Sequence, residues 1–123
     1  MGVERLRQAG IDTAIITGEE SPSVRQRAAK LKLQHLYLGI RDKRSHLDVI
    51  LKETGLSIDE LAYIGDDVND LGIIEEIRTS GLTAAPTDAM GAVRTAVHYR
   101  TAARGGHGAF REFAEWILRL RGT

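Results

Sequence analysis

Short apolar runs alternate along the chain with longer amphipathic stretches. The apolar runs predict five strands, at 13–17, 35–38, 61–65, 81–85 and 97–99. The stretches between and around them predict helices at 2–9, from Pro22 onward, at 43–54, at 69–77, at 88–95 and at the C-terminal end. In the last helix the apolar stripe consists of Phe110, Phe113, Ala114, Ile117 and Leu118.

Strict alternation of strands with helices predicts an α/β fold. Crossovers of this kind are right-handed, which gives a three-layer, Rossmann-like, mainly parallel sheet with helices on both faces. We expect one domain over residues 1–123, because this length suits a single modest core. In such sheets ligands bind where the strands end at their carboxyl edge.

The amino-acid composition limits the kinds of partner and of site that we expect for this chain. Lys plus Arg and Asp plus Glu both total 17, so no charge excess indicates nucleic acid or a membrane as partner. The chain contains no cysteine, which excludes disulfides and thiolate metal sites and is compatible with a reducing cytoplasm. We also expect no signal peptide and no membrane span, because no apolar run reaches the required length.

The densest candidate chemistry follows the strand at 61–65, where Asp66, Asp67, Asn69 and Asp70 occupy five consecutive positions with Val68. Carboxylates packed this closely repel one another unless a cation lies among them. Oxygen ligands at a strand's carboxyl end suit Mg²⁺, which leaves room for a phosphate. The alternative is that these residues are helix N-caps and turn formers, but capping accounts for one of them and not for four.

Two further strand ends carry suitable groups. Thr17 supplies a hydroxyl, and Gly18 lets backbone N–H groups approach an anion closely. Lys43 begins a predicted helix, where its ammonium could neutralise a phosphoryl group. Taken singly, Thr17-Gly18 is also typical of a turn, and Lys43 of a solvated surface. Together with the acidic cluster they form a set suited to handling phosphate.

This order of motifs resembles the haloacid dehalogenase superfamily of phosphatases. Residues 15–18 look like its second motif, Lys43 like its third and residues 65–70 like its fourth. More narrowly, the chain is similar to the cap-less sugar-acid phosphatases, which hydrolyse 3-deoxy-D-manno-octulosonate 8-phosphate or nonulosonate 9-phosphates. The closer match extends through residues 39–43 and 104–112.

The resemblance implies a role for each matching residue. Asp66 would hold Mg²⁺, supported directly or through water by Asp67 and Asp70. Phosphate-binding residues would be Thr17, Gly18, Lys43 and Asn69, with Thr17 and Lys43 acting in catalysis.

The resemblance also implies substrate contacts and an assembly. Glu19 follows Thr17-Gly18 as in the nonulosonate branch, where this Glu and a lysine corresponding to Lys30 help to select the sugar. Arg104, Gly105 and Gly106 belong to a basic segment that in the family closes the site, often within a homotetramer. The alternatives are solvated charges at Glu19 and Lys30, and a flexible lead-in to the last helix at 104–108.

The family's first motif, Asp-x-Asp, has no counterpart here, because no two aspartates are spaced two apart. In the family this motif supplies the nucleophile and the general acid/base, on a strand that is central in the sheet. We therefore expect an N-terminally incomplete domain with little or no turnover, whether as a fragment or as a natural variant. A different hypothesis is a non-catalytic oligomerisation or regulatory module, such as the phosphatase-like domain fused behind cytidylyltransferases. A response-regulator receiver is disfavoured, because its phosphoaccepting Asp is not evident.

Overall fold

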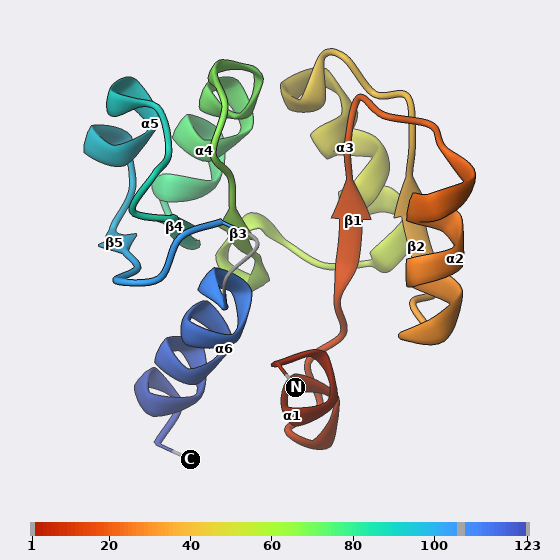
Figure 1. The fold of residues 1–123 in the computed structure, drawn as a ribbon, viewed down its shortest axis with the longest axis horizontal. Helices are drawn as coiled ribbons and strands as arrows, with labels where there is room; N and C mark the ends of the chain where they lie inside the picture. The colour runs from red at the N-terminus through yellow and green to blue at the C-terminus, as the bar shows by residue number, and fades with distance from the viewer. Residues whose placement is uncertain (1, 106–107, 123) are drawn as a thin grey trace. The chain divides into compact units, whose positions relative to one another are not determined.

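The computed structural model describes residues 2–105 and 108–122, which fall into two compact units (Figure 1). Unit 1 comprises Met1–Arg41 and Ala114–Thr123, and unit 2 comprises Asp42–Phe113. The single domain expected over 1–123 stays a prediction. Over the described part of the chain, no helix combines the length and apolarity needed to cross a membrane.

Unit 1 is built on a two-stranded parallel sheet. Its elements are α1 (Gly2–Gln8), β1 (Ala14–Ile16), α2 (Pro22–Lys30), β2 (His35–Tyr37) and the later turns of α6 (Ala109–Leu120). Strands β1 and β2 pair in the register Ala14 to His35 and Ile16 to Tyr37. Helix α2 begins at the N-cap Ser21 followed by Pro22, as the sequence predicts.

Unit 2 contains a three-stranded parallel sheet in the order β3-β4-β5. Its elements are α3 (Lys43–Thr54), the 3₁₀ turn η1 (Ile58–Glu60), β3 (Ala62–Ile64), the 3₁₀ turn η2 (Val68–Asp70), α4 (Leu71–Arg78), β4 (Leu82–Ala85), α5 (Gly91–Ala96), β5 (Tyr99–Arg100) and the first turn of α6. Ala62 pairs with Leu82, and Ala84 pairs with Tyr99.

Helices α4 and α5 pack on the middle strand of this sheet. Their buried side chains meet β4 in a cluster of Ile74, Ala85, Ala89, Val93 and Val97. Tyr63 and Leu71 pack against the same cluster. Residues on both sides of the turn that follows β3 thus pack against the hydrophobic core of unit 2.

The expected α/β class with parallel strands is confirmed. The strands are distributed over two sheets, one in each unit, where the sequence predicts one. The helix predicted at 69–77 starts as the separate turn η2, and α4 begins only at Leu71. The helix predicted at 88–95 begins only at Gly91, because residues 86–90 form a loop with hydrogen bonds of its own. The strand predicted at 97–99 begins at Tyr99 and extends to Arg100.

We predict that Gly81→Ala destabilises the protein by about 1–3 kcal/mol, the usual cost of overpacking. A Cβ at this position would lie 2.6 Å from the carbonyl oxygen of Leu61 and 2.7 Å from that of Ile58, and backbone atoms cannot rotate away. Urea unfolding of the two proteins measures the difference in free energy.

Gly91→Ala is the matched control, because a Cβ there meets no atom within 4 Å and Gly91 begins α5. This substitution should leave stability unchanged or raise it by up to about 1 kcal/mol. Equal unfolding midpoints for the two variants would contradict the packing described at Gly81.

Candidate functional site

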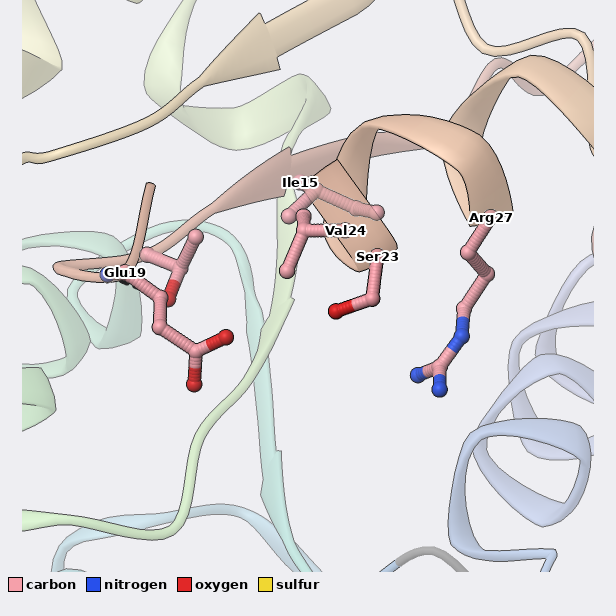
Figure 2. Close-up of a pocket in the computed structure, with 6 residues that line it drawn as sticks. Ile15, Glu19, Ser23, Val24 and Arg27 are labelled. Atoms are coloured by element: carbon pink, nitrogen blue, oxygen red, sulfur yellow. Dashed lines mark hydrogen bonds between the residues drawn. The ribbon is translucent and has the colours of Figure 1, made fainter. Parts of the chain in front are cut away.

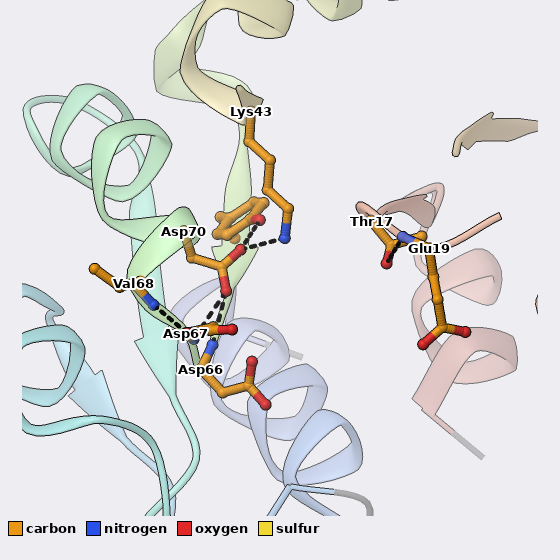
Figure 3. Close-up of polar contacts among 8 residues, drawn as sticks. Thr17, Glu19, Lys43, Asp66, Asp67, Val68 and Asp70 are labelled. Atoms are coloured by element: carbon orange, nitrogen blue, oxygen red, sulfur yellow. Dashed lines mark hydrogen bonds and ion pairs between the residues drawn. The ribbon is translucent and has the colours of Figure 1, made fainter. Parts of the chain in front are cut away.

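The carboxylate of Asp70 accepts four hydrogen bonds at the carboxyl end of β3 (Figure 3). Oδ1 accepts from Lys43 Nζ at 2.6 Å and from the Tyr63 hydroxyl at 2.5 Å. Oδ2 accepts from the backbone N–H groups of Asp66 and Asp67, both at 3.0 Å. Asp70 is only 3% exposed and Lys43 only 7%, so this is a buried ion pair whose acceptor is fully satisfied.

Glycine at position 65 makes this arrangement possible. The backbone N–H of Gly65 donates to the carbonyl of Ala84 at 3.2 Å, which extends the pairing of β3 with β4 by one residue. A Cβ on Gly65 would lie 2.6 Å from Cγ of Asp70, so only glycine lets that carboxylate fold back over the strand end. Asp67 and Asp70 then form a reciprocal capping box around η2.

Lys43 is positioned by the start of α3. Its neighbour Asp42 caps this helix, accepting the backbone N–H of Ser45 at 3.2 Å. The first helical residue is therefore held at a defined place, and its side chain runs to Asp70 rather than into solvent. The alternative of a solvated surface lysine does not hold in this structure, because Lys43 is buried.

Burial and hydrogen bonds oppose each other at Asp70. Burial alone would raise the pKa of this carboxyl, but the hydrogen bonds from Lys43, Tyr63 and the backbone, together with the charge of Lys43, lower the pKa below its ordinary value. Burial and the adjacent carboxylate of Asp70 raise the pKa of Tyr63 well above its usual range. Asp70 is therefore an anion at neutral pH and Tyr63 remains a hydrogen-bond donor.

Asp66 presents an exposed carboxylate on a fixed backbone. Its N–H is held by Asp70, and its carbonyl accepts the N–H of Met90 at 3.1 Å. Within residues 2–105 and 108–122, no hydrogen bond or ion pair engages the Asp66 carboxylate. The Asp67 carboxylate, in contrast, is engaged, because its Oδ1 accepts the N–H of Val68 at 2.6 Å. Asn69, two residues further along, is exposed.

The three predicted metal carboxylates do not converge on one point. Among the described residues, no group of three or more His, Cys, Asp or Glu side chains could together hold a metal ion. Four donors already occupy the oxygens of Asp70, whereas the Asp66 carboxylate is open. Mg²⁺ commonly takes one or two protein carboxylates and completes its shell with water and phosphate oxygens. The residues present fit such a site with Asp66 as its main carboxylate.

In unit 1, Thr17 closes the end of β1. Its N–H donates to the carbonyl of Tyr37 at 3.0 Å, and its carbonyl accepts from Ile40 at 2.9 Å. The hydroxyl oxygen accepts the N–H of Glu19 at 3.1 Å, which leaves the hydroxyl proton available to a ligand. A Cβ on Gly18 would lie 3.6 Å from the Ile40 carbonyl oxygen, an ordinary contact, so local packing does not require glycine there.

A depression of about 320 Å³ opens beside these residues, lined by Ile15, Thr17, Glu19, Ser23, Val24 and Arg27 (Figure 2). Ser23 and Arg27 come from α2, four residues apart and so on one helix face. Sequence reasoning did not select these two residues, although that spacing was visible. Lys30, the predicted partner of Glu19, is exposed at the end of α2 and is not one of the lining residues.

The basic segment before α6 is tied down where it is described. Arg104 is exposed, and the N–H of Gly105 donates to Asp88 Oδ1 at 2.8 Å. Gly106, the third predicted residue of this segment, lies outside the described residues. Unit 2 thus brings Lys43 together with Asp66, Asp67 and Asp70, and adds Tyr63, which sequence reasoning missed.

Comparison with known proteins finds no matching family model. The curated 3-deoxy-D-manno-octulosonate 8-phosphate phosphatase KdsC of Haemophilus influenzae is 34% identical over 122 residues, which cover 99% of this chain and 66% of that protein. The chain spans between 61% and 66% of the length of such curated relatives.

Solved structures agree over nearly the whole chain. The cobalt-bound H. influenzae phosphatase has a TM-score of 0.91 at 35% identity, covering 98% of this chain and 69% of that one. The Moraxella catarrhalis phosphatase, in complex with magnesium, phosphate and KDO, has a TM-score of 0.88 at 37% identity. The match covers 96% of this chain and 66% of that one. A HAD superfamily (subfamily III A) hydrolase from Legionella pneumophila has a TM-score of 0.92 at 40% identity. The match covers 98% of this chain and 65% of that one.

We predict that Asp70→Ala destabilises the protein by about 3–5 kcal/mol, because it leaves the buried ammonium of Lys43 without its partner. Urea unfolding measures the loss. The control is Glu20→Ala, which removes the exposed 3.0 Å pair with Arg25 and should cost about 1 kcal/mol or less. A loss at Asp70 no larger than that of the control would disprove the buried pair.

The lowered pKa of Asp70 also predicts a pH dependence. In the unfolded chain this carboxyl has its ordinary pKa of 3.8, whereas in the folded chain its pKa is lower, so it takes up a proton only at a more acidic pH. The stabilisation is therefore present above pH 3.8 and is lost as pH falls through the lower folded pKa. The stability difference between wild type and Asp70→Asn should shrink on acidification below about pH 4. A difference that stays constant from pH 7 to pH 3 would refute this, with Asp48→Asn as the exposed control.

Proposed function

Because the chain belongs to the KdsC/YrbI family of haloacid dehalogenase phosphatases, we propose that it forms part of a Mg²⁺-dependent phosphomonoesterase acting on a sugar acid. The substrate would be 3-deoxy-D-manno-octulosonate 8-phosphate or a nonulosonate 9-phosphate. The relatives named KdsC, and the structure of the Moraxella catarrhalis phosphatase with KDO and phosphate, support this substrate class.

The observation that carries the proposal is the division of labour around Asp70. This residue is buried and holds Lys43 and the backbone of Asp66 at the carboxyl end of β3. Asp66 offers an exposed carboxylate, and its backbone N–H and the Lys43 ammonium are held by the two oxygens of the same Asp70 carboxylate. A carboxylate for a cation beside a cation for a phosphate is the combination that phosphoryl chemistry requires.

Asp66 would be the principal Mg²⁺ ligand. Asp67 would support it directly or through water, and Asp70 would support it by fixing the turn. When bound, Mg²⁺ neutralises charge on phosphoryl oxygens. Relatives solved with magnesium and with cobalt are consistent with a divalent cation.

The phosphate would be bound by Thr17, Gly18, Lys43 and Asn69. The Thr17 hydroxyl keeps a proton to donate, since its oxygen is the acceptor of the Glu19 N–H. Lys43 has three N–H donors, of which the described residues use one for Asp70. Gly18 would allow a phosphoryl oxygen close to its backbone N–H, a reason for glycine that local packing does not give.

The sugar acid would be recognised by Glu19, Lys30, Arg104, Gly105 and Gly106. Glu19 lines the depression beside Thr17, and there Ser23 and Arg27 add a hydroxyl and a guanidinium to its polar wall. We further propose a cytoplasmic homo-oligomer, a tetramer as in the resembling family, with no nucleic acid or membrane as partner.

No two aspartates in these 123 residues are spaced two apart, so the family's Asp-x-Asp motif has no counterpart among them. By family, an aspartate of an Asp-x-Asp motif attacks phosphorus and forms an aspartyl-phosphate. We therefore expect this chain by itself to turn over little or no substrate.

The test measures phosphate release with Mg²⁺ from both sugar-acid phosphates, for this chain and for one extended upstream to include an Asp-x-Asp motif. We expect activity only in the extended chain, lost on addition of EDTA and reduced by at least about 100-fold in Asp66→Asn, the range seen when a key electrostatic group is removed. Activity of the short chain would overturn the expected need for the motif.

The absence of the Asp-x-Asp spacing favours one other function, a non-catalytic oligomerisation or regulatory module. Its expectation differs in the same assay, because neither the short nor the extended chain would release phosphate. The exposed Asp66 carboxylate and the buried Lys43 speak for the phosphatase, since a purely structural module has no need of them.

A further inference from the structure

Glu112, in the first turn of α6, fixes the start of the segment that contains Arg104. Its Oε2 accepts the Tyr99 hydroxyl at 2.7 Å and the N–H of Ala102 at 2.9 Å. Its Oε1 accepts the N–H of Ala103 at 3.0 Å. A carboxylate that accepts two consecutive backbone N–H groups orients the chain as a helix cap does.

A second set of contacts fixes the end of the same segment. Asp88 Oδ1 accepts the N–H of Gly105 at 2.8 Å, and the N–H of Thr87 donates to the carbonyl of Ala103 at 3.3 Å. A Cβ on Gly105 would lie 3.5 Å from both Asp88 Oδ1 and Pro86, so the segment lies close against the loop at 86–90. That loop also holds the acidic turn, because Met90 donates to the carbonyl of Asp66.

Arg104 stands between the two anchored stretches. Its neighbours Ala103 and Gly105 are each held by a carboxylate, whereas Arg104 itself is exposed. Within the described parts of the chain, no hydrogen bond or ion pair engages its guanidinium. A long side chain normally loses rotational and backbone freedom when it binds, and anchoring of its backbone removes part of that cost before the ligand arrives.

We propose that Glu112 and Asp88 are positioning residues for Arg104, which binds the anionic part of the substrate from an immobilised backbone. This role rests on the proposed phosphatase function and deepens it. Glu112 and Asp88 do not touch the substrate; they act through Arg104 and keep it in register with the acidic turn through the loop at 86–90.

The test is a comparison of KM and kcat in the extended, active chain with 3-deoxy-D-manno-octulosonate 8-phosphate. Arg104→Ala should raise KM about tenfold, the loss of roughly one charge-assisted hydrogen bond. Glu112→Gln turns an amide NH₂ toward backbone N–H donors and should raise KM similarly, with kcat changed less than twofold. Asp88→Ala should do the same, and Asp88→Asn should restore KM because its amide oxygen still accepts from Gly105.

Double variants separate positioning from an independent effect. If Glu112 acts through Arg104, then Glu112→Gln should raise KM no further once Arg104 is alanine. Glu115→Gln is the matched control on the same helix, because it weakens a partly exposed pair with Arg5 and should leave KM unchanged.

Amide hydrogen exchange in the 123-residue chain supplies a readout that does not need turnover. Exchange at Ala102 and Ala103 should accelerate about tenfold in Glu112→Gln, and exchange at Gly105 likewise in Asp88→Ala. Unchanged exchange at these amides, or KM effects that add fully to that of Arg104→Ala, would overturn the positioning role alone. No phosphate release from the extended wild-type chain would instead refute the proposed function, and this role with it.

Discussion

One carboxylate, that of Asp70, organises the turn on which the candidate site depends. A buried anion is costly unless its lone pairs are satisfied, and here four donors satisfy them: an ammonium, a phenol and two backbone amides. These donors come from the start of α3, from β3 and from the turn that follows β3. The ammonium is a candidate phosphate ligand, and the amides belong to the two residues expected to serve the cation. Removal of this single side chain would release all of them at once.

This arrangement assigns different tasks to residues that look equivalent in the sequence. Asp66, Asp67 and Asp70 are three aspartates within five positions, yet one is buried, one caps a turn and one has an open carboxylate. Electrostatic repulsion among them is relieved partly by Lys43, and so a metal ion is not needed to hold all three. The candidate cation site is accordingly smaller than a three-carboxylate cage, which suits Mg²⁺ with a phosphate among its ligands.

Carboxylates organise the Arg104 segment in a similar way. Glu112 and Asp88 both accept hydrogen bonds from backbone amides. Because an amide is uncharged, such a contact orients the chain without neutralising the arginine next to it. A segment that composition alone marks as flexible, with its glycines and its cation, is therefore held firmly up to Gly105. In unit 2, the carboxylates of Asp70, Asp88 and Glu112 thus serve as acceptors for backbone amides, whereas Asp66 and Arg104 are exposed.

By itself, the sequence determined the α/β class, the placement of most helices and strands, the family and the candidate groups at Thr17, Lys43 and Asp66 to Asp70. These predictions rest on features that involve only neighbours in the chain. The features are the local periodicity, the Ser21-Pro22 helix start and the clustered aspartates. The tertiary structure decided which aspartate is buried, and that Tyr63 and Gly65 surround it. It also decided that Arg27 and not Lys30 lines the depression beside Glu19. Finally, it decided that Glu112 holds the segment before α6. Each of these joins residues that are not adjacent in sequence, and burial of a side chain depends on what packs over it, which no local pattern of residues specifies.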